Sequence, residues 1–430
     1  MNNIVEKTHE FLHKHGMHPD DLDMMAELSR LRANMENGLA GNCAAGDCKM
    51  LPAFIAPDRK PPLGEKVLTL DAGGTNLRAA LVSFTENGPV IEQLITRPLP
   101  GLGAPISKDD FLREIARFSA PLAEQSTRLG FCFSYPAEIM PDGDGKVLFF
   151  TKEIEVTGSE GMLVCRELLD TYAEMGIKAP TSYALVNDTV AAMLGGCATA
   201  EQEMDGALGL ILGTGNNVCY LASTKNIHRP VYGWSSPKMV INAESGGYSG
   251  FPQGDFDKQL DAASMAPGTY GNEKMVGGVY QGEVLRYTLN GAAEELFSPE
   301  FRERLKDVGL LTAVHLSAFA AEPKGDNVLA NLCATEEDRS SMEVIVDCLL
   351  ERAAKLVTLS LAGPMEAEDM GKSAPALVVA EGSTFWKNAA LHGKIERLAE
   401  EFLLGKLGRK CIFMGAENPN LVGAAMAALQ

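Results

Sequence analysis

The chain has 430 residues, of which 46% are hydrophobic and 22% are charged. This composition is close to that of globular proteins and excludes a disordered chain, and no apolar run approaches the ~18 residues of a membrane-spanning helix. The 38 Lys and Arg against 57 Asp and Glu give a formal net charge of −19, which disfavours binding to nucleic acid or to an anionic membrane. From the length we expect two or three domains.

The N-terminus and the cysteines point to a reducing compartment. The first seven residues lack the basic and apolar pattern of a secretory signal, so we expect no export. Nine cysteines are spread from Cys43 to Cys411 without a C-x-x-C pair, which argues against a disulfide framework and against a zinc ribbon. Several, such as Cys132 and Cys219, lie in apolar segments, where cysteine behaves as a small core residue. We therefore expect a cytoplasmic protein.

The first 40 residues are predicted to be helical and acidic. His9 and His13 lie four residues apart on one helix face, a spacing that could in principle hold a metal ion. We favour a solvated terminal helix, because Gly16 and Pro19 interrupt the helix and no carboxylate partner is fixed beside the histidines. The proline-containing connector at 58–64 marks a candidate boundary before the first clear strand.

A β-hairpin with a glycine-rich tip is predicted at residues 67–84. Strand-like alternation over 67–71 leads into Ala-Gly-Gly-Thr-Asn, and a second β-rich run follows. The same pattern recurs at 208–221, with Gly-Thr-Gly-Asn-Asn as the turn. The matching glycines, Gly74 and Gly215, are separated by a domain-sized interval. Two similar domains, each with one glycine-rich hairpin, are therefore expected.

Such hairpins suit the binding of anions, because glycine lets consecutive N–H groups converge on phosphate oxygens. Thr75 and Thr214 add hydroxyl donors, and Asp71 could face a hydrated Mg²⁺. For either hairpin alone, a plain tight turn is an equally good explanation, but two copies favour nucleotide phosphates. Other phosphate motifs fail, since Val218 replaces the third glycine of a dinucleotide fingerprint and Glu366 replaces the first glycine of a P-loop.

Between the hairpins, a short apolar strand is predicted to end at Val186, and a helix follows it directly. Asn187 and Asp188 therefore stand at a strand end and a helix start. Capping of the helix is the simpler interpretation, because Asn and Asp are favoured N-caps. In the functional interpretation, a carboxylate at the positive helix end stays ionised and can accept a proton.

Several segments together resemble one family. They are, in chain order, Leu39 with Met-Leu-Pro-Ala-Phe at 50–54, Leu-Asp-Ala-Gly-Gly-Thr-Asn-Leu-Arg at 70–78, Leu-Gly-Phe-Cys-Phe-Ser-Tyr-Pro at 129–136, Thr-Lys at 151–152, Leu-Val-Asn-Asp-Thr at 185–189, Gly-Thr-Gly-Asn-Asn at 213–217, Asn-Ala-Glu at 242–244 and Gly-Val-Tyr-Gln-Gly-Glu at 278–283. In these segments the chain resembles a hexokinase of the hexokinase/glucokinase type, in the actin-like ATPase superfamily, and it is most similar to the bacterial single-unit type. The resemblance runs from about the N-terminal to the C-terminal helix.

The resemblance implies an α/β protein with the two-lobed actin-like ATPase (ribonuclease H-like) fold and a central cleft. The small lobe would comprise residues 66–187 with about 415–430, and the large lobe residues 1–65 with 188–414. The hinge would lie near Asp188 and again near Met414. The cleft of the family closes when sugar binds, which would keep water from the phosphoryl group.

The resemblance also implies residue roles. Asp188 would be the base that deprotonates the primary hydroxyl of the sugar, and Lys152 would hold charge near the transferring phosphoryl group. The sugar-binding set would be Ser134, Thr151, Lys152, Asn187, Asp188, Asn217, Glu244 and Glu283. The nucleotide-binding set would be Asp71, Gly73, Gly74, Thr75, Asn76, Arg78, Thr214, Gly215, Gly382 and Ser383. Asp71 would meet Mg²⁺ through water.

Two positions and one segment depart from the family pattern. Tyr135 stands where the family usually has Phe, and Glu381 stands where Asp is usual. The segment 415–420, which contains Glu417, replaces the last glycine-serine nucleotide motif. Glu417 would be unfavourable beside a nucleotide unless its side chain points away.

The implied activity is ATP-dependent and Mg²⁺-dependent phosphorylation of a hexose at the 6-hydroxyl, giving hexose 6-phosphate and ADP, the first step of glycolysis. Glucose is the first candidate, with mannose and fructose after it. The alternatives are a sugar sensor without catalysis and a kinase for another polyol or amino sugar. The retained phosphate apparatus argues against the sensor. Expected partners are the hexose and the nucleotide, with neither nucleic acid nor membrane, and the oligomeric state, monomer or homodimer, is open.

Overall fold

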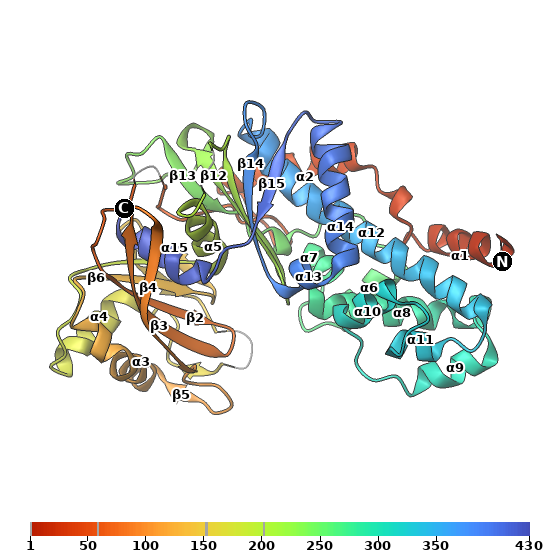
Figure 1. Cartoon of the computed structure of the whole chain (residues 1–430), viewed down its shortest axis with the longest axis horizontal. Coiled ribbons are helices and arrows are strands. Elements are labelled where there is room, and N and C mark those ends of the chain that lie inside the picture. Colours follow the sequence, from red (N-terminus) through yellow and green to blue (C-terminus); the bar gives the residue numbers. More distant parts are fainter. Residues whose placement is uncertain (1, 58–59, 151–153, 201–202) are drawn as a thin grey trace.

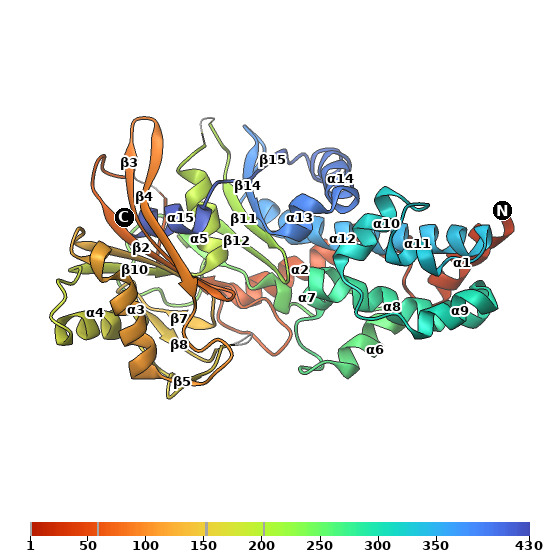
Figure 2. The ribbon, with the colours of Figure 1, turned by 60° about the horizontal axis from the view of Figure 1, so that its bottom comes forward.

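Two β-sheets with helices between and around them form the framework of the protein. The structure, a computed structural model, describes residues 2–57, 60–150, 154–200 and 203–430. The helices α5 (Asp188–Cys197) and α15 (Pro419–Ala428) lie between the two sheets (Figures 1 and 2). Most of the other helices gather on the larger sheet, at the end of the molecule away from the smaller sheet (Figure 1). The fold is therefore two-lobed.

The smaller sheet has five strands in the order β10–β6–β2–β3–β4. β3 pairs antiparallel with β2 and β4, whereas β6 pairs parallel with β2 and β10. Leu68 and Leu70 of β2 pack toward α3 and α4, and Val67 packs toward α5 and α15, so both faces are covered. The elements of this lobe are β2 (Val67–Gly73), β3 (Asn76–Thr85), β4 (Gly88–Pro98), α3 (Lys108–Ala123), β6 (Arg128–Phe133), α4 (Val164–Glu174) and β10 (Ser182–Val186), with the short strand pairs β5 (Ile106–Ser107) and β9 (Val156–Thr157), and β7 (Ala137–Ile139) and β8 (Gly145–Val147).

The larger sheet has six strands in the order β1–β13–β12–β11–β14–β15. β11 pairs antiparallel with β12 and parallel with β14. Leu208 and Leu210 of β11 are buried in the large helical core, while Ala207 packs toward α5 on the other face. The strands are β1 (Leu51–Pro52), β11 (Ala207–Leu212), β12 (Asn216–Ser223), β13 (Lys238–Asn242), β14 (Ala376–Glu381) and β15 (Cys411–Met414).

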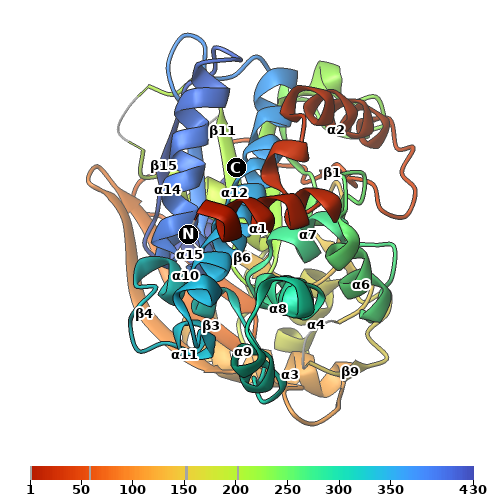
Figure 3. The same cartoon turned by 90° about the vertical axis from the view of Figure 1, so that its right-hand side faces the viewer.

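The longest helix, α12 (Glu336–Ala367), organises the helical end of the molecule. It contacts α1, α2, α7, α8 and α14, and α1 lies against it in the end-on view (Figure 3). Within the described residues, no helix is both long enough and apolar enough to cross a bilayer. The other helices are α1 (Asn2–Lys14), η1 (Pro19–Asp21), α2 (Met24–Leu39), η2 (Thr224–Asn226), η3 (Ser245–Gly247), α6 (Asp255–Ala263), α7 (Gly271–Val276), α8 (Gly278–Leu296), α9 (Pro299–Lys306), α10 (Ala313–Ala321), α11 (Val328–Leu332), α13 (Ser383–Lys387), α14 (Ala389–Leu398) and η4 (Ala399–Leu404).

Both predicted hairpins are confirmed. β2 and β3 pair in register from Val67 with Val82 to Gly73 with Asn76, so that Gly74 and Thr75 form the tip. Gly74 has a φ of 61°, a left-handed conformation that favours glycine. β11 and β12 form the second hairpin, whose tip is residues 213–215.

The two lobes meet through close contact between α5 and α15. A Cβ atom added at Gly423 of α15 would lie 1.8 Å from the carbonyl oxygen of Ala191 in α5. At Gly130 of β6, a Cβ would lie 2.1 Å from the carbonyl oxygen of Ala424. These glycines therefore let α15 pack tightly against both strand β6 of the smaller sheet and helix α5.

The variant Gly423→Ala is expected to destabilise the protein by about 1–3 kcal/mol, because the added methyl group overlaps a backbone carbonyl that must move. Urea unfolding followed by circular dichroism measures this. The matched control is Gly393→Ala on α14, where an added Cβ meets no atom within 4 Å and Ala favours the helix. Equal unfolding midpoints for the two variants would contradict the packing argument.

Candidate active site

A cleft of about 430 Å³ is lined by residues of both lobes. The first hairpin, the end of β6, the start of α5, the ends of β11 and β14 and the start of α15 contribute to it. Most of these elements present a strand end or a helix start, where backbone groups and short polar side chains are available for a ligand. The lining residues are Asp71, Gly73, Gly74, Asn76, Arg78, Thr96, Ser134, Asp188, Ile211, Glu381, Gly382 and Asn420.

Asp188 is the first residue of α5 and lines the cleft. The N-cap of the helix is Asn187, whose side chain accepts a hydrogen bond from the Thr189 N–H at 2.9 Å. Asp188 Oδ1 also accepts from the Thr189 N–H, at 2.7 Å. Asn187 therefore caps the helix while Asp188 lines the cleft. The positive N-terminal end of the helix favours a negatively charged carboxylate on Asp188.

Asp71, at the end of β2, is buried and ion-paired with Arg78 of β3 through Oδ2. The Arg78 Nε donates to Oδ2 at 2.9 Å, and Nη1 donates to Asn418 Oδ1 at 3.3 Å, just before α15. Burial raises the pKa of Asp71, and Arg78 opposes that shift. Asp71 Oδ1 is buried and has no nitrogen or hydroxyl donor among the described residues.

Glu381 is a third carboxylate in the cleft, at the end of β14. Its Oε2 is buried and has no hydrogen-bond partner within the described part of the chain. Burial, together with repulsion from Asp188 and Asp71, raises the pKa of Glu381 to about 7. Near neutral pH this carboxyl group is therefore partly protonated.

Tyr135, which follows Ser134 in the chain, contacts the tip of the first hairpin. The hydroxyl of Tyr135 donates to the Gly74 carbonyl oxygen at 2.8 Å, and the residue is only 2% exposed. Its ring packs against Phe133 and Phe150. The Tyr hydroxyl thus ties the predicted sugar segment to the predicted phosphate hairpin, a contact that Phe could not make.

A polar network lies beside the start of α5. The Asn217 side chain donates to Thr189 Oγ1 at 2.9 Å and to Asn242 Oδ1 at 2.8 Å, and the Asn242 side chain donates to Glu244 Oε1 at 2.7 Å. Glu244 has a φ of 51°, a left-handed conformation rare for this residue type. Burial raises its pKa to about 7; the Asn242 hydrogen bond opposes this, and Asp188 and Glu273 add repulsion.

The tip of the second hairpin is enclosed by the starts of two helices. The Gly278 N–H of α8 donates to the Gly213 carbonyl at 2.8 Å, and Thr384 Oγ1 of α13 donates to the same oxygen at 2.8 Å. A Cβ at Gly382 would lie 2.3 Å from the Leu212 carbonyl oxygen, so only glycine fits there. The predicted residues Thr214, Gly215, Gly382 and Ser383 are therefore brought to one corner of the large lobe.

Not all predicted site residues gather in the cleft. Thr151 and Lys152 lie outside the described residues. Glu283 of α8 is engaged by Arg286 of the same helix, whose Nε donates to both carboxylate oxygens at 3.1 Å, and it does not line the cleft. Glu417 is exposed and is not among the lining residues, which agrees with a side chain that points away from a nucleotide.

Several residues of the cleft and the polar network were absent from the predicted set. Glu381 ends an apolar strand directly before Gly382, and a carboxylate at a strand end is the pattern that also predicts Asp188, so the sequence could have indicated Glu381. Asn242 begins the Asn-Ala-Glu motif at 242–244, but its hydrogen bonds depend on the pairing of β12 with β13. Thr96, Ile211, Asn420 and Glu273 carried no sequence signal that distinguishes them from structural residues.

The two-lobed fold and its glycine-tipped hairpins are those of the actin-like ATPases. A hexokinase from Schistosoma mansoni, solved in complex with glucose, has a TM-score of 0.79 and 25% sequence identity, with 99% of each chain covered. Another hexokinase structure has a TM-score of 0.79 at 21% identity, which supports the fold. Family models described as hexokinase match residues 7–198 and 207–430. The chain therefore belongs to the hexokinase family.

Curated relatives agree with this assignment. Human Hexokinase-2 is 28% identical, and the alignment covers 98% of this chain but 48% of that protein. Hexokinase-1 of Nicotiana tabacum is also 28% identical, with 97% of this chain and 89% of that protein covered. The chain thus spans about half the length of the human relatives and most of the tobacco relative.

Proposed function

We propose that this protein transfers the terminal phosphoryl group of ATP to the 6-hydroxyl of a hexose, with glucose as the first candidate. The observation that carries the proposal is the carboxylate of Asp188 at the start of α5, in the same cleft as the first glycine hairpin and Ser134. A base and a phosphate-binding hairpin in one cleft are the parts that phosphoryl transfer requires.

In this mechanism, Asp188 accepts the proton of the attacking hydroxyl. Its Oδ1 is engaged by the Thr189 N–H, which fixes the orientation of the carboxylate. The network of Asn217, Asn242 and Glu244 is linked to Thr189 and hence to Asp188. A sugar bound to this network would place one hydroxyl beside Asp188. Because the buried polar groups of such a site need partners, the site discriminates against sugars that lack the matching hydroxyls.

The nucleotide phosphates would lie against the backbone N–H groups at the two hairpin tips. The residues fit a hydrated Mg²⁺, because Asp71 lines the cleft, its Oδ1 has no nitrogen or hydroxyl donor among the described residues, and carboxylate oxygens are preferred ligands of this ion. When bound, the ion would neutralise phosphate charge. Arg78 would keep Asp71 in position through its contact with Oδ2.

Closure of the lobes around the substrates would exclude water. We place the lobes at residues 66–187 with about 415–430, and 1–65 with 188–414, with hinges near Asp188 and Met414. Gly423 of α15, which packs against the Ala191 carbonyl of α5, lies at that junction. Thr151 and Lys152 would join the site from the segment after Phe150.

The test is an ADP-release assay with Mg-ATP over a panel of glucose, mannose, fructose, an amino sugar and a polyol. Glucose 6-phosphate must appear in the same amount as ADP. Glucose-dependent thermal stabilisation without ADP would favour a sensor, and a higher kcat/KM for another acceptor would reassign the substrate.

The variant Tyr135→Phe is expected to raise the KM for ATP several-fold while leaving the KM for the sugar nearly unchanged, because the Gly74 carbonyl loses its hydroxyl donor. The loss of one neutral hydrogen bond should lower stability by about 0.5–1.5 kcal/mol. Initial rates at varied ATP, with urea unfolding in parallel, give both numbers.

The matched control for this variant is Tyr172→Phe. Tyr172 is also fully buried, and its hydroxyl is hydrogen-bonded to Ser119 Oγ at 2.6 Å between α3 and α4. It should lose similar stability with an unchanged KM for ATP. The same KM for ATP in both variants would show that Tyr135 does not position the hairpin.

A further inference from the structure

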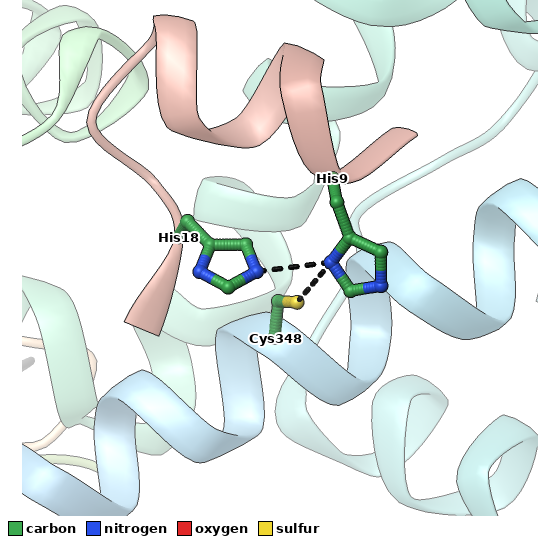
Figure 4. Close-up of side chains that lie close together, drawn as sticks. All are labelled: His9, His18 and Cys348. Atoms are coloured by element: carbon green, nitrogen blue, oxygen red, sulfur yellow. Dashed lines mark hydrogen bonds between the residues drawn. The ribbon is translucent and has the colours of Figure 1, made fainter. Parts of the chain in front are cut away.

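Three side chains from distant parts of the sequence meet at the helical end of the molecule, outside the cleft. His9 lies on α1, His18 directly precedes η1, and Cys348 lies on α12 (Figure 4). The His9 Nδ1 is 2.9 Å from His18 Nε2, and Cys348 Sγ is 4.0 Å from His9 Nδ1. One nitrogen or sulfur atom of each residue lies within 4.8 Å of the other two.

We propose that His9, His18 and Cys348 bind a single zinc ion. Imidazole nitrogens and a cysteine thiolate are both ordinary protein ligands of Zn²⁺, and a water or substrate takes the fourth tetrahedral position where the protein supplies three ligands. Bonds of about 2.0–2.1 Å to nitrogen and 2.3 Å to sulfur place tetrahedral ligand atoms about 3.3–3.6 Å apart. The His9–His18 separation of 2.9 Å and the His9–Cys348 separation of 4.0 Å bracket that range, and the ligand atoms of His18 and Cys348 lie within 4.8 Å of each other, so small side-chain shifts would bring all three atoms to zinc-binding positions.

The surroundings suit a stable site. His18 and Cys348 are buried, with 7% and 4% exposure, while His9 is half-buried and gives solvent access for a fourth ligand. The predicted pairing of His9 with His13 is not the arrangement found. His13 instead stacks on the His18 ring with centroids 3.7 Å apart, and its Nδ1 is 2.7 Å from Asp21 Oδ1.

Groups outside the ligand set orient the His18 ring. Its Nδ1 accepts the Asp20 N–H at 3.2 Å, which leaves the Nε2 proton to donate to His9. An ion at Nε2 would leave the ring proton on Nδ1, so the Asp20 N–H would lose this acceptor, and the Asp20 carboxylate, 3.9 Å from Nδ1, would move closer to accept the ring proton. Lys355 of α12 fixes this turn by donating to the Pro19 carbonyl at 2.7 Å. A carboxylate behind a ligating histidine is the usual support of a zinc site.

Such an ion would join the N-terminal segment to the central helix α12. Its binding energy would add to the stability of the folded protein, because the ligands are close together only in the folded state. Zinc binding would release one proton, because the Cys348 thiol loses its proton when it becomes a thiolate ligand. Since none of the three residues lines the cleft, the ion should change stability rather than turnover.

The experiment uses the full chain without an affinity tag, purified and dialysed against zinc. We expect one equivalent of zinc by elemental analysis. With Co²⁺ as a spectroscopic probe, we expect a sulfur-to-metal charge-transfer band that shows thiolate ligation. Absence of bound zinc together with absence of that band in the native protein would overturn the proposal, whatever the variants do.

Two variants test the ligands individually. Cys348→Ser removes the thiolate at nearly constant size, and His18→Asn removes Nε2 while keeping a side-chain acceptor for the Asp20 N–H. Each should weaken zinc affinity by at least roughly 10²-fold, beyond the 10–100-fold typical of supporting residues. The controls are His13→Gln and Cys333→Ser, a neighbouring histidine and another buried cysteine, which should bind zinc as the native protein does. Native affinity in Cys348→Ser would refute the site.

Thermal unfolding separates ligand loss from misfolding. Without zinc, the native protein and Cys348→Ser should have similar unfolding temperatures. With excess zinc, only the native protein and the two controls should shift to a higher temperature. An equal zinc-induced shift in Cys348→Ser would show that the ion binds elsewhere.

Discussion

Replacing Asp188 by Asn is expected to lower kcat for hexose phosphorylation by roughly 10²–10⁴-fold, the range for losing a positioned general base. Asn keeps the size and the hydrogen-bonding shape of the carboxylate, and Asn187 still caps α5 through its contact with the Thr189 N–H. A lower kcat in this variant would therefore reflect the loss of proton transfer and not a destabilised helix. The measurement is the initial rate at saturating sugar and Mg-ATP, followed through ADP release.

Two comparisons show whether the lower kcat is specific to the carboxylate of Asp188. Asp170→Asn applies the same chemical change to an exposed residue of α4 and should retain native kcat. Thermal stabilisation by glucose in Asp188→Asn shows whether the sugar still binds. A variant that binds sugar and keeps native turnover would remove Asp188 from the mechanism.

Local sequence patterns were sufficient to predict the parts of the site that depend on short segments. The hairpin at Gly74 requires a turn between two β-rich runs, and both its strands and its left-handed tip are encoded within about 20 consecutive residues. The junction at Asn187 and Asp188 likewise follows from an apolar strand that precedes a helical pattern. Motif order then pointed to the family.

Contacts that depend on packing between distant segments could not be predicted. Asn420 reaches the cleft because α15 packs against the smaller sheet, and Glu381 reaches it because β14 pairs parallel with β11. His9 and Cys348 are 339 positions apart, so a pattern search that compares neighbours in sequence finds His13 as the partner of His9 instead. In each case the missing information was which surfaces pack together.

The chain as a whole has a net charge of −19, and its cleft likewise carries more acidic than basic side chains. Among the lining residues, Asp71, Asp188 and Glu381 are acidic, and Arg78 is already paired with Asp71. Burial of Glu381 partly relieves the repulsion on an anionic nucleotide, since its pKa of about 7 leaves it partly protonated. The remaining attraction must come from backbone N–H groups at the hairpin tips and from a bound cation.

Sugar affinity is expected to weaken as the pH falls below about 7, because Glu244 must be ionised to accept hydrogen bonds from sugar hydroxyls. Burial raises its pKa from 4.5 to about 7, so protonation begins near neutral pH. With one linked proton, the Kd for glucose should rise about tenfold for each pH unit well below the pKa. Isothermal titration calorimetry between pH 5.5 and 8 measures this, and buffers of different ionisation enthalpy report the proton released on binding.

The unliganded protein should show the opposite dependence on pH. Between 4.5 and about 7 the folded state keeps a proton on Glu244 that the unfolded state has lost, so this group's contribution to stability falls as the pH rises. Glu244→Gln should remove the pH dependence of glucose binding and weaken binding by roughly 10²-fold, since hydrogen bonds to a charged group contribute about 1.5–3 kcal/mol each. Glu381→Gln is the matched control: it removes another acid with a pKa of about 7 but should leave the pH dependence of sugar binding intact. If the dependence disappeared in Glu381→Gln and persisted in Glu244→Gln, the sugar-linked proton would belong to Glu381.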